Sequence, residues 1–338
     1  MKRRTIIFIL LGSLLISSCK SKGNLDSVEE PLLNTPKIEE KVENETIDLN
    51  SKSRSYAVMI NNASPARRLQ SGLQDAYLIY EIIVESGITR YMALFMDAET
   101  ERIGSIRSAR HYFLDYAIEN DAIYVHHGQS PQAQKDFNKL GLTRIAVGEP
   151  KTGWRENEHN VDWEHKLFTN IKNIEKGLSN KRTERNGELL LNYSDDVIDL
   201  SKIEGAKKAN KVEVEYSSAV SNSYEYDPKT ERYKRFINGS PHKDYVTNKQ
   251  YTFKNIIVVK IGNSLIKGDT KGRQELFNIG EKDGYYITNG YAVPIKAIKS
   301  SRTAKTVYKY LNGEEIVVSN GNTFIQIQPL SKKLNIED

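Results

Sequence analysis

The sequence predicts an α+β protein, with an N-terminal mixed sheet and packed helices followed by a smaller, mainly antiparallel β domain. Helical and strand-like segments are mixed between residues 55 and 200. From residue 210 to residue 332, short alternating strands prevail, as they do in antiparallel sheets. Four Asn-Gly pairs lie in this second region. Asn-Gly between alternating strands is a strong hairpin signal, because both residues adopt positive φ.

The first domain is expected to begin with three strands, at residues 56–60, 77–84 and 91–96. The second and third of these are joined by a short loop that contains Gly87, so they are predicted to form a hairpin. Strands and helices in one region indicate a sheet with helices packed against it.

Helices are expected next, at residues 111–119 and 131–140, with a strand at 122–126 between them. Ser130 suits the N-cap of the second helix, and Pro131 suits its first turn. A further helical pattern covers residues 165–178.

The second domain, residues 210–332, is expected to contain short strands and to end in a meander. Residues 179–210, which are rich in Lys, Asn and Ser, are the expected connection from the first domain. The predicted strands are 212–216, 232–237, 255–261, 285–288, 291–295, 306–311, 315–318 and 323–328.

The first 18 residues have the pattern of a secretory signal peptide. A basic start precedes an apolar run at residues 6–16, and two serines then precede Cys19. This arrangement resembles the lipobox of bacterial lipoproteins, and it predicts a diacylated (palmitate-bearing) Cys19 that anchors the chain to the extracytoplasmic face of the cell membrane. The alternative is an ordinary signal peptide with an incidental cysteine.

Residues 19–54 are predicted to be the lipidated cysteine and a flexible tether, because this segment has few large apolar residues. Removal of the leader would lower the formal net charge from +5 to +2. Such a weak balance, together with export, argues against nucleic acid as a partner. Cys19 is the only cysteine, so no disulfide is expected within the chain.

The first group of candidate ligand-binding residues lies on the predicted hairpin. Glu81 and Glu85 are four residues apart and would share one face of a strand. Both lie in an apolar run and need partners, because an unpaired buried charge is costly. Arg90 on the neighbouring strand is one such partner. The alternative is a buried ion pair that only fixes the register of the hairpin.

The second group consists of Arg107 and Arg110, which flank the start of the predicted helix at residue 111. Arginine is unfavourable near the positive end of a helix dipole, so two arginines there indicate an anion from a ligand or from the protein itself. The alternative partners within the chain are Glu81, Glu85 and Asp75.

Ser130 is the last candidate, because it lies at a helix start with free backbone N–H groups. No metal site is expected, since His126 and His127 would point to opposite faces of a strand, and His159 and His165 are poorly spaced for one helical face. The sequence contains no phosphate-binding loop, dinucleotide fingerprint or nucleophile elbow, so no cofactor is expected.

Several short motifs are spread along residues 55–332. They are Ala57-Val58-Met59-Ile60-Asn61-Asn62, Gln70-Ser71-Gly72-Leu73, Tyr80-Glu81, Gly87-Ile88-Thr89-Arg90, Arg107-Ser108-Ala109-Arg110, Ser130-Pro131-Gln132-Ala133, Tyr226-Asp227, His242-Lys243-Asp244, Gly272-Arg273 and Asn320-Gly321-Asn322. These motifs resemble those of the YerB-like bacterial lipoproteins, a two-domain family of unknown function, and the resemblance implies two domains and export. Phe324 and Ile298 stand where this family usually has Trp.

A second, fainter resemblance is to the LytR-CpsA-Psr phosphotransferases, which transfer lipid-linked glycopolymers to the cell wall. The shared layout is Asp75, a strand at 77–84, Arg107 with Arg110, and a helix start at 128–133. The chain lacks the Arg-Asp-Thr-like triplet of those enzymes. This layout is analogy at the level of the fold.

Three hypotheses for the function follow. The first is an envelope lipoprotein that binds an anionic ligand (a glycopolymer, a lipid phosphate or a peptide carboxylate) between Arg90, Arg107 and Arg110. The second is an enzyme in which Glu81 or Glu85 supports phosphoryl or glycosyl transfer. The third is a non-catalytic scaffold for cell-wall proteins.

Overall fold

The computed structural model describes residues 47–338. The predicted signal peptide, Cys19 and most of the predicted tether lie outside the described residues. In the part that is described, no helix is long and apolar enough to cross a membrane.

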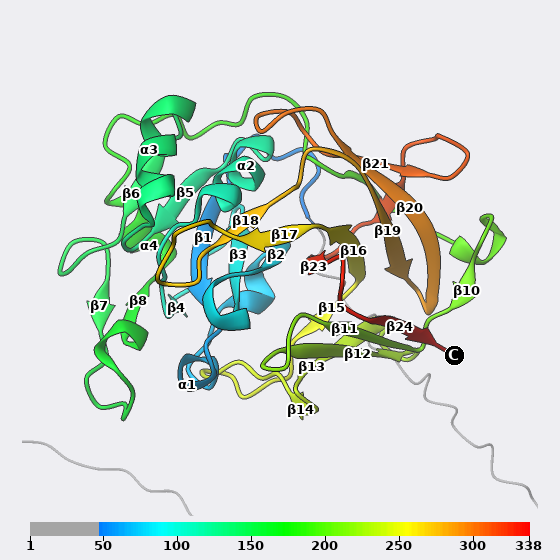
Figure 1. Cartoon of the computed structure of the whole chain (residues 1–338), viewed down its shortest axis with the longest axis horizontal. Coiled ribbons are helices and arrows are strands. Elements are labelled where there is room, and N and C mark those ends of the chain that lie inside the picture. The colour runs from blue at the N-terminus through cyan, green and yellow to red at the C-terminus, as the bar shows by residue number, and fades with distance from the viewer. Residues whose placement is uncertain (1–46) are drawn as a thin grey trace, which may run out of the picture. The chain divides into compact units, whose positions relative to one another are not determined.

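The centre of the fold is an 11-stranded mixed sheet (Figure 1). Its strand order is β10-β20-β19-β16-β23-β2-β3-β1-β5-β6, with β21 paired to β20. The strands are β1 (Tyr56–Asn61), β2 (Leu78–Ile83), β3 (Thr89–Phe95), β5 (Ile123–His126), β6 (Arg144–Ala146), β10 (Lys207–Lys208), β16 (Asn255–Ile261), β19 (Gly280–Thr288), β20 (Tyr291–Lys299), β21 (Val307–Tyr310) and β23 (Thr323–Pro329).

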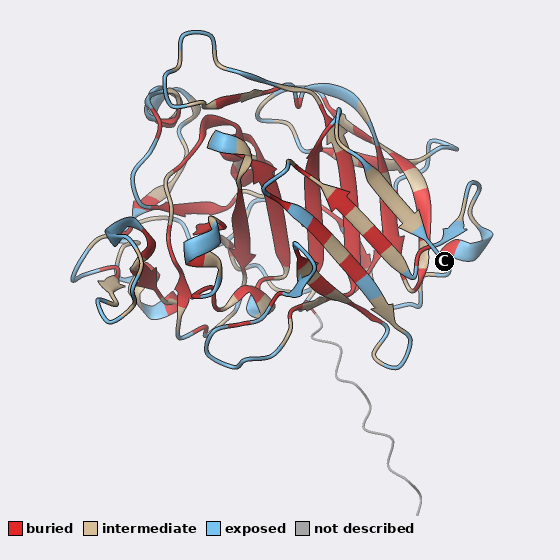
Figure 2. Cartoon of the chain, turned by 60° about the horizontal axis from the view of Figure 1, so that its bottom comes forward, coloured by how far each residue is buried: buried red, intermediate tan, exposed pale blue. Residues whose placement is uncertain are grey.

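A second sheet of six strands is antiparallel throughout. Figure 2 shows buried and exposed residues alternating along its strands, because one face packs on the protein and the other meets solvent. It comprises β11 (Lys211–Glu215), β12 (Ser221–Asp227), β13 (Arg232–Ile237), β14 (Ser240–Pro241), β15 (Thr252–Phe253) and β24 (Leu334–Glu337).

The remaining elements are short. In one of three small sheets, β8 (Leu167–Thr169) lies between β4 (Ile103–Gly104) and β7 (Trp154–Arg155). The other two pair β9 (Asn192–Ser194) with β22 (Val317–Ser319), and β17 (Asn263–Leu265) with β18 (Gln274–Leu276). The helices are α1 (Ser64–Arg67), α2 (His111–Glu119), α3 (Pro131–Leu140) and α4 (Ile171–Glu175), with 3₁₀ turns η1 (Leu73–Asp75), η2 (Glu85–Gly87), η3 (Trp163–His165) and η4 (Leu200–Lys202).

The two faces of the main sheet belong to two different cores. On one face, Tyr80 and Tyr124 share a core cluster with Phe113 of α2 and Phe137 of α3. On the other face, side chains such as Tyr91 share a core cluster with the inward residues of the second sheet. Alternate strand residues point to opposite faces, which is why one strand serves both cores. Figure 1 shows α2 and α3 above the main sheet and the second sheet below it.

The strands of the two predicted domains pair in one continuous sheet, which the sequence does not reveal. β23, near the C-terminus, lies between β2 and β16 and runs parallel to both. Parallel strands need a long crossover connection, so their pairing leaves no local sequence signal. The domain boundaries at residues 200 and 210 stay a prediction.

The predicted fold class is confirmed in part: the protein is mostly strand, with a mixed sheet and few helices. The helix over residues 131–140 is confirmed, and Ser130 Oγ caps it by accepting a hydrogen bond from Ala133 N at 3.1 Å. Asn238-Gly239 and Asn289-Gly290 form the expected turns, with positive φ at all four residues.

Three expectations differ from the structure. The 165–178 segment contains a strand, β8, and only the short helix α4. The meander ends at β21, because β22 pairs with β9 and β23 inserts into the main sheet. Residues 47–54 are packed rather than free, since Ile47 is buried and its N–H donates to Asn320 Oδ1 at 2.8 Å.

Candidate functional site

Glu81 lies in the middle of β2 and points at the second sheet. It forms an ion pair with Arg235 of β13 at 2.8 Å, and both side chains are 0 % exposed. Glu81 also accepts hydrogen bonds from Thr89 Oγ1 at 2.7 Å and from Asn222 Nδ2 at 2.8 Å. The carboxylate that the sequence placed in a ligand site therefore joins the two sheets instead.

A chain of hydrogen bonds continues from this pair. Arg235 Nη1 donates to His242 Nδ1 at 2.6 Å, so the imidazole proton lies on Nε2, which donates to Gln70 Oε1 at 2.5 Å. Gln70 Nε2 in turn donates to Asn62 Oδ1 at 3.2 Å. Burial, with the charge of Arg235, lowers the pKa of His242 well below its usual value and keeps the ring neutral. All members of this network are buried, and His242, at 4 %, is the most exposed of them.

Glu85, Arg90 and Arg110 are brought together, as the sequence predicts, and with Arg107 and Arg273 they form what we name the arginine cluster. Glu85 forms ion pairs with Arg90 at 3.2 Å and with Arg110, and it lies 4.0 Å from Arg273. Although burial alone would raise it, the hydrogen bond from Arg110 and the charge of Arg90 hold the pKa of Glu85 below its usual value.

Arg90 is the most enclosed member of the arginine cluster. Burial, followed by the nearby charge of Arg110, lowers the pKa of Arg90 to about 9. Its Nη1 donates to the carbonyl of Ser108 at 2.6 Å. Among the described residues, the Nε atoms of Arg90, Arg107 and Arg273 are buried without a hydrogen-bond partner.

Arg107 lies at the edge of the arginine cluster, and the remaining predicted site residues, Ser130 and Glu81, are used elsewhere in the fold. Arg107 forms an ion pair with Glu164 at 2.7 Å at the solvent edge, where the carboxylate is 57 % exposed. Ser130 is used as the α3 cap. Glu81 and Glu85 do not share a face, because β2 ends at Ile83 and Glu85 lies in the turn η2.

A cavity of about 480 Å³ that the sequence analysis did not anticipate lies between α1 and the segment that follows β13. We name it the basic cavity, because its lining includes Arg67, Arg68 and Lys243. Within the described part of the chain, no carboxylate lies in ion-pair range of any of the three. Among residues 47–338, Arg67 donates hydrogen bonds only to Asn62, and Arg68 donates to the carbonyl of Asn160 at 3.0 Å.

Asp244 also lines the basic cavity, but its carboxylate is buried and fully used. Oδ2 accepts from Gly72 N and from Tyr251 Oη, both at 2.8 Å. Oδ1 accepts from Val246 N at 2.9 Å and from Thr247 N at 2.8 Å. Asp244 therefore fixes the loop that follows it and ties that loop to the first half of the chain.

Gly72, whose N–H binds Asp244, lies close to residues 100–102. Gly72 has φ +82°, and a Cβ there would lie 2.7 Å from Thr100 Cγ2 and 2.8 Å from Arg102 O. Only glycine fits at this position without a clash.

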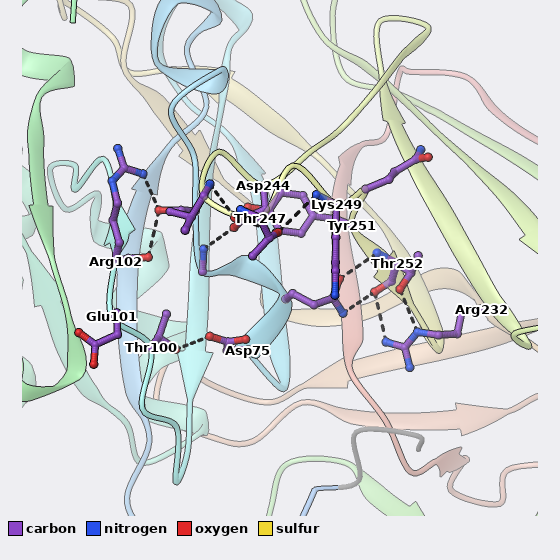
Figure 3. Close-up of a pocket in the computed structure, with 15 residues that line it drawn as sticks. Asp75, Thr100, Glu101, Arg102, Arg232, Asp244, Thr247, Lys249, Tyr251 and Thr252 are labelled. Carbon is purple, nitrogen blue, oxygen red and sulfur yellow. Dashed lines mark hydrogen bonds between the residues drawn. The ribbon is translucent and has the colours of Figure 1, made fainter. Parts of the chain in front are cut away.

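Loop 243–249 separates the basic cavity from a second cavity of about 490 Å³, which we name the polar cavity (Figure 3). Arg102 lies on one wall and Arg232 on the opposite wall, with Asp75 and Lys249 also lining it. Arg102 lines the polar cavity, and its guanidinium is held by Glu156 at 2.7 Å.

The sequence gives only weak indications of these cavities. Arg67-Arg68 is a pair of adjacent cations, and His242-Lys243-Asp244 is one of the motifs shared with the YerB-like family. Nothing local showed that loop 243–249 would lie against residues 67–75. A third group, Glu156, Glu158 and His159, has the spacing of metal ligands, but Glu156 is already bound by Arg102 and His159.

Two segments of the chain match the two domains of one protein family. Residues 42–184 match the family described as "Protein of unknown function (DUF3048) N-terminal domain", and residues 212–325 match the C-terminal domain of the same family. The chain belongs to the DUF3048 family. The YerB-like resemblance seen in the sequence is thereby confirmed.

A DUF3048 relative from Bacillus subtilis (strain 168), named "Putative lipoprotein YerB", is 30% identical over 335 residues, which are 95% of this chain and 91% of the relative. The crystal structure of YerB protein from Bacillus subtilis matches with a TM-score of 0.71 and 27% identity, over 88% of this chain and 97% of that one.

Each cavity is lined by residues from both the N-terminal and the C-terminal DUF3048 segment. The N-terminal match supplies Arg67, Arg68 and Asp75, and the C-terminal match supplies Lys243 and Lys249.

Proposed function

We propose that this DUF3048 protein is a lipid-anchored protein of the cell envelope that binds an anionic ligand in the basic cavity. One observation carries the proposal: Arg67, Arg68 and Lys243 line a space of about 480 Å³, and no carboxylate of the described residues neutralises them. Volumes of this size are typical of small-molecule sites.

The chemistry of the three side chains favours phosphate or carboxylate. A guanidinium presents N–H donors in a planar fork that matches both anions bidentately, and an ammonium adds a point charge. Asp244 does not compete for these cations, because four groups of the protein already occupy its oxygens.

The location in the envelope rests on the signal-like start, on Cys19 and on the name of the relative. Two or more acyl chains on one cysteine hold a protein stably on a membrane. Replacement of Cys19 by serine is expected to move the protein from the membrane fraction to the soluble fraction of fractionated cells. Retention in the membrane would contradict the anchor.

A second candidate site is the arginine cluster, and the unpartnered Nε atoms of Arg90, Arg107 and Arg273 are the observation that favours it. There the ligand would add to ion pairs that already exist. A phosphotransferase-like activity on lipid-linked glycopolymers would need this site, since Glu85 is the carboxylate that the arginines surround.

Calorimetric titration of the full mature chain in detergent with inorganic pyrophosphate tests the proposal and separates the two sites. The double variant Arg67→Gln and Arg68→Gln is expected to lower affinity at least about tenfold, since hydrogen bonds to charged groups each contribute about 1.5–3 kcal/mol. Arg182→Gln, an exposed arginine paired with Asp121, is the matched control.

Two results would overturn the assignment. Absence of pyrophosphate binding to the wild type would remove the anion site altogether. Loss of binding in the double variant Arg107→Gln and Arg273→Gln, with binding retained when Arg67 and Arg68 are replaced, would move the site to the arginine cluster.

A further inference from the structure

We infer that the ligand is a linear polymer in which anionic units alternate with neutral, hydroxyl-rich units, and that the basic cavity and the polar cavity hold neighbouring units of it. The anionic part of this inference rests on the proposed function. The second cavity and the ridge between the cavities supply the rest.

The two cavities flank one loop. Lys243 and Tyr245 line the basic cavity, Val246 and Lys249 line the polar cavity, and Asp244 contributes to both. Their volumes are nearly equal, at about 480 and 490 Å³. Two hollows of similar size on either side of one ridge suit a ligand with a repeating unit better than one compact molecule.

The charges that line the two cavities differ. The accessible charges of the basic cavity are all cations, as described above. The polar cavity is instead lined by three cations, Arg102, Arg232 and Lys249, and by three carboxylates, Asp75, Glu101 and Asp244. A balanced lining gives no net attraction to an anion, so the unit bound there is expected to be neutral and rich in hydroxyl groups.

Two groups in the polar cavity are available to such a unit. Asp75 is exposed, and its carboxylate accepts a hydrogen bond from Thr100 Oγ1 at 2.7 Å, which leaves lone pairs for ligand hydroxyls. Lys249 is exposed, and no side-chain partner is found for its ammonium within residues 47–338. Figure 3 shows Asp75 and Thr100 at the lower end of the cavity.

The ridge carries apolar surface. Tyr245 is 47 % exposed and Val246 is 62 % exposed. The Tyr245 ring is held in place, because Arg102 lies 4.7 Å from its centroid and His159 packs edge-on at 5.4 Å. An exposed ring fixed between two polar hollows offers a stacking face for the carbon skeleton of the polymer where it crosses.

The ridge is also rigid before any ligand arrives. Asp244 fixes the backbone of Val246 and Thr247, and Tyr245 N donates to the carbonyl of Gln70 at 2.8 Å. A preformed site loses less conformational entropy on binding, which favours recognition of an extended chain.

The test compares glycerol 3-phosphate with poly(glycerol phosphate) oligomers of defined length, titrated into the full mature chain. An oligomer of two or more units is expected to bind at least about tenfold more tightly than the monomer, since the second unit binds intramolecularly. The double variant Asp75→Asn and Lys249→Gln is expected to reduce oligomer affinity toward the monomer value while monomer affinity stays unchanged.

The control is the double variant Asp196→Asn and Lys229→Gln, which changes the same residue types at exposed positions outside both cavities. Equal affinity of monomer and oligomer for the wild type would overturn the inference and leave the proposed function intact. An oligomer advantage that survives in the Asp75 and Lys249 variant would overturn it as well. Failure of both ligands to bind would instead contradict the proposed function.

Discussion

The arginine cluster and the basic cavity hold the same kinds of side chain in opposite electrostatic settings. In the cluster, Arg90 and Arg110 share the carboxylate of Glu85. In the cavity, Arg67 and Arg68 have only neutral oxygen partners among the described residues. The arginine cluster has the charge pairing of a structural ion-pair network. The basic cavity has cations without a carboxylate partner among the described residues, as an anion-binding site would.

The comparison teaches that the number of arginines in a motif does not locate an anion site. The location of an anion site depends on whether the fold places a carboxylate of the protein next to those arginines. Glu81 makes the same point, because it pairs with an arginine 154 residues away rather than with Arg90 on the adjacent strand. The free energies of unfolding of variants in the two regions measure how much each setting contributes to stability.

The largest effect is expected at the most enclosed pair. Glu81→Gln leaves Arg235 charged and buried without a carboxylate, which typically costs about 3–5 kcal/mol. Urea unfolding of the variant and the wild type measures the loss. Glu213→Gln, which breaks an exposed pair with Lys211, is the control and should change stability by less than about 1 kcal/mol. Similar losses in both variants would mean that burial of the pair is unimportant.

Acid pH is expected to destabilise the fold through His126, which is buried as a neutral ring. Burial lowers the pKa of His126 to about 4, so the ring is neutral in the folded protein. The unfolded chain takes up this proton near pH 6.5. Stability contributed by the neutral ring is therefore full above pH 6.5 and is lost as pH falls from 6.5 to about 4, by about 3 kcal/mol.

Urea unfolding at several pH values tests this slope. His126→Gln is expected to flatten the dependence between pH 6.5 and 4, whereas His127→Gln, at the exposed neighbouring position, should leave it unchanged. Identical pH profiles for the wild type and His126→Gln would contradict the prediction.

A smaller loss is expected in the arginine cluster. Glu85→Gln removes the carboxylate that Arg90 and Arg110 share and should cost about 2 kcal/mol, because their donors stay partly buried. Thermal unfolding monitored by circular dichroism measures the change, with Glu149→Gln as control, because Glu149 is a carboxylate 43 % exposed that pairs with a single arginine, Arg155. If the loss is no greater than in the control, the cluster is not held by its own carboxylate.

The smallest effect on stability is expected in the basic cavity. The double variant Arg67→Gln and Arg68→Gln breaks no ion pair, so its free energy of unfolding should stay within about 0.5 kcal/mol of the wild type. The same unfolding assays apply. A loss comparable to that of Glu85→Gln would show that these arginines are structural, and the contrast between the two regions would disappear.

Much of the local structure was predictable from sequence. Short apolar runs bounded by turn-like residues located β1, β2, β3 and β5, and the Ser130-Pro131 pair located the start of α3. These signals are local, because capping and turn geometry involve residues within a few positions of one another. The segment at 165–178 was misassigned, since a short strand and a short helix there mimic one helical period.

The candidate site was predictable only in part. Glu85, Arg90 and Arg110 are close in sequence and do meet. The basic cavity joins residues near 67 to residues near 243, and no pattern in either segment refers to the other.

The sequence by itself determined the export-like start, the local elements and the supply of cations near the first sheet. Only the tertiary structure shows that β23 lies between β2 and β16 and that Glu81 pairs with Arg235. The same is true of the two cavities that flank loop 243–249. The physical reason is range: hydrophobic period and capping act over a few residues, whereas charge pairing and cavity formation depend on contacts between segments far apart in the chain.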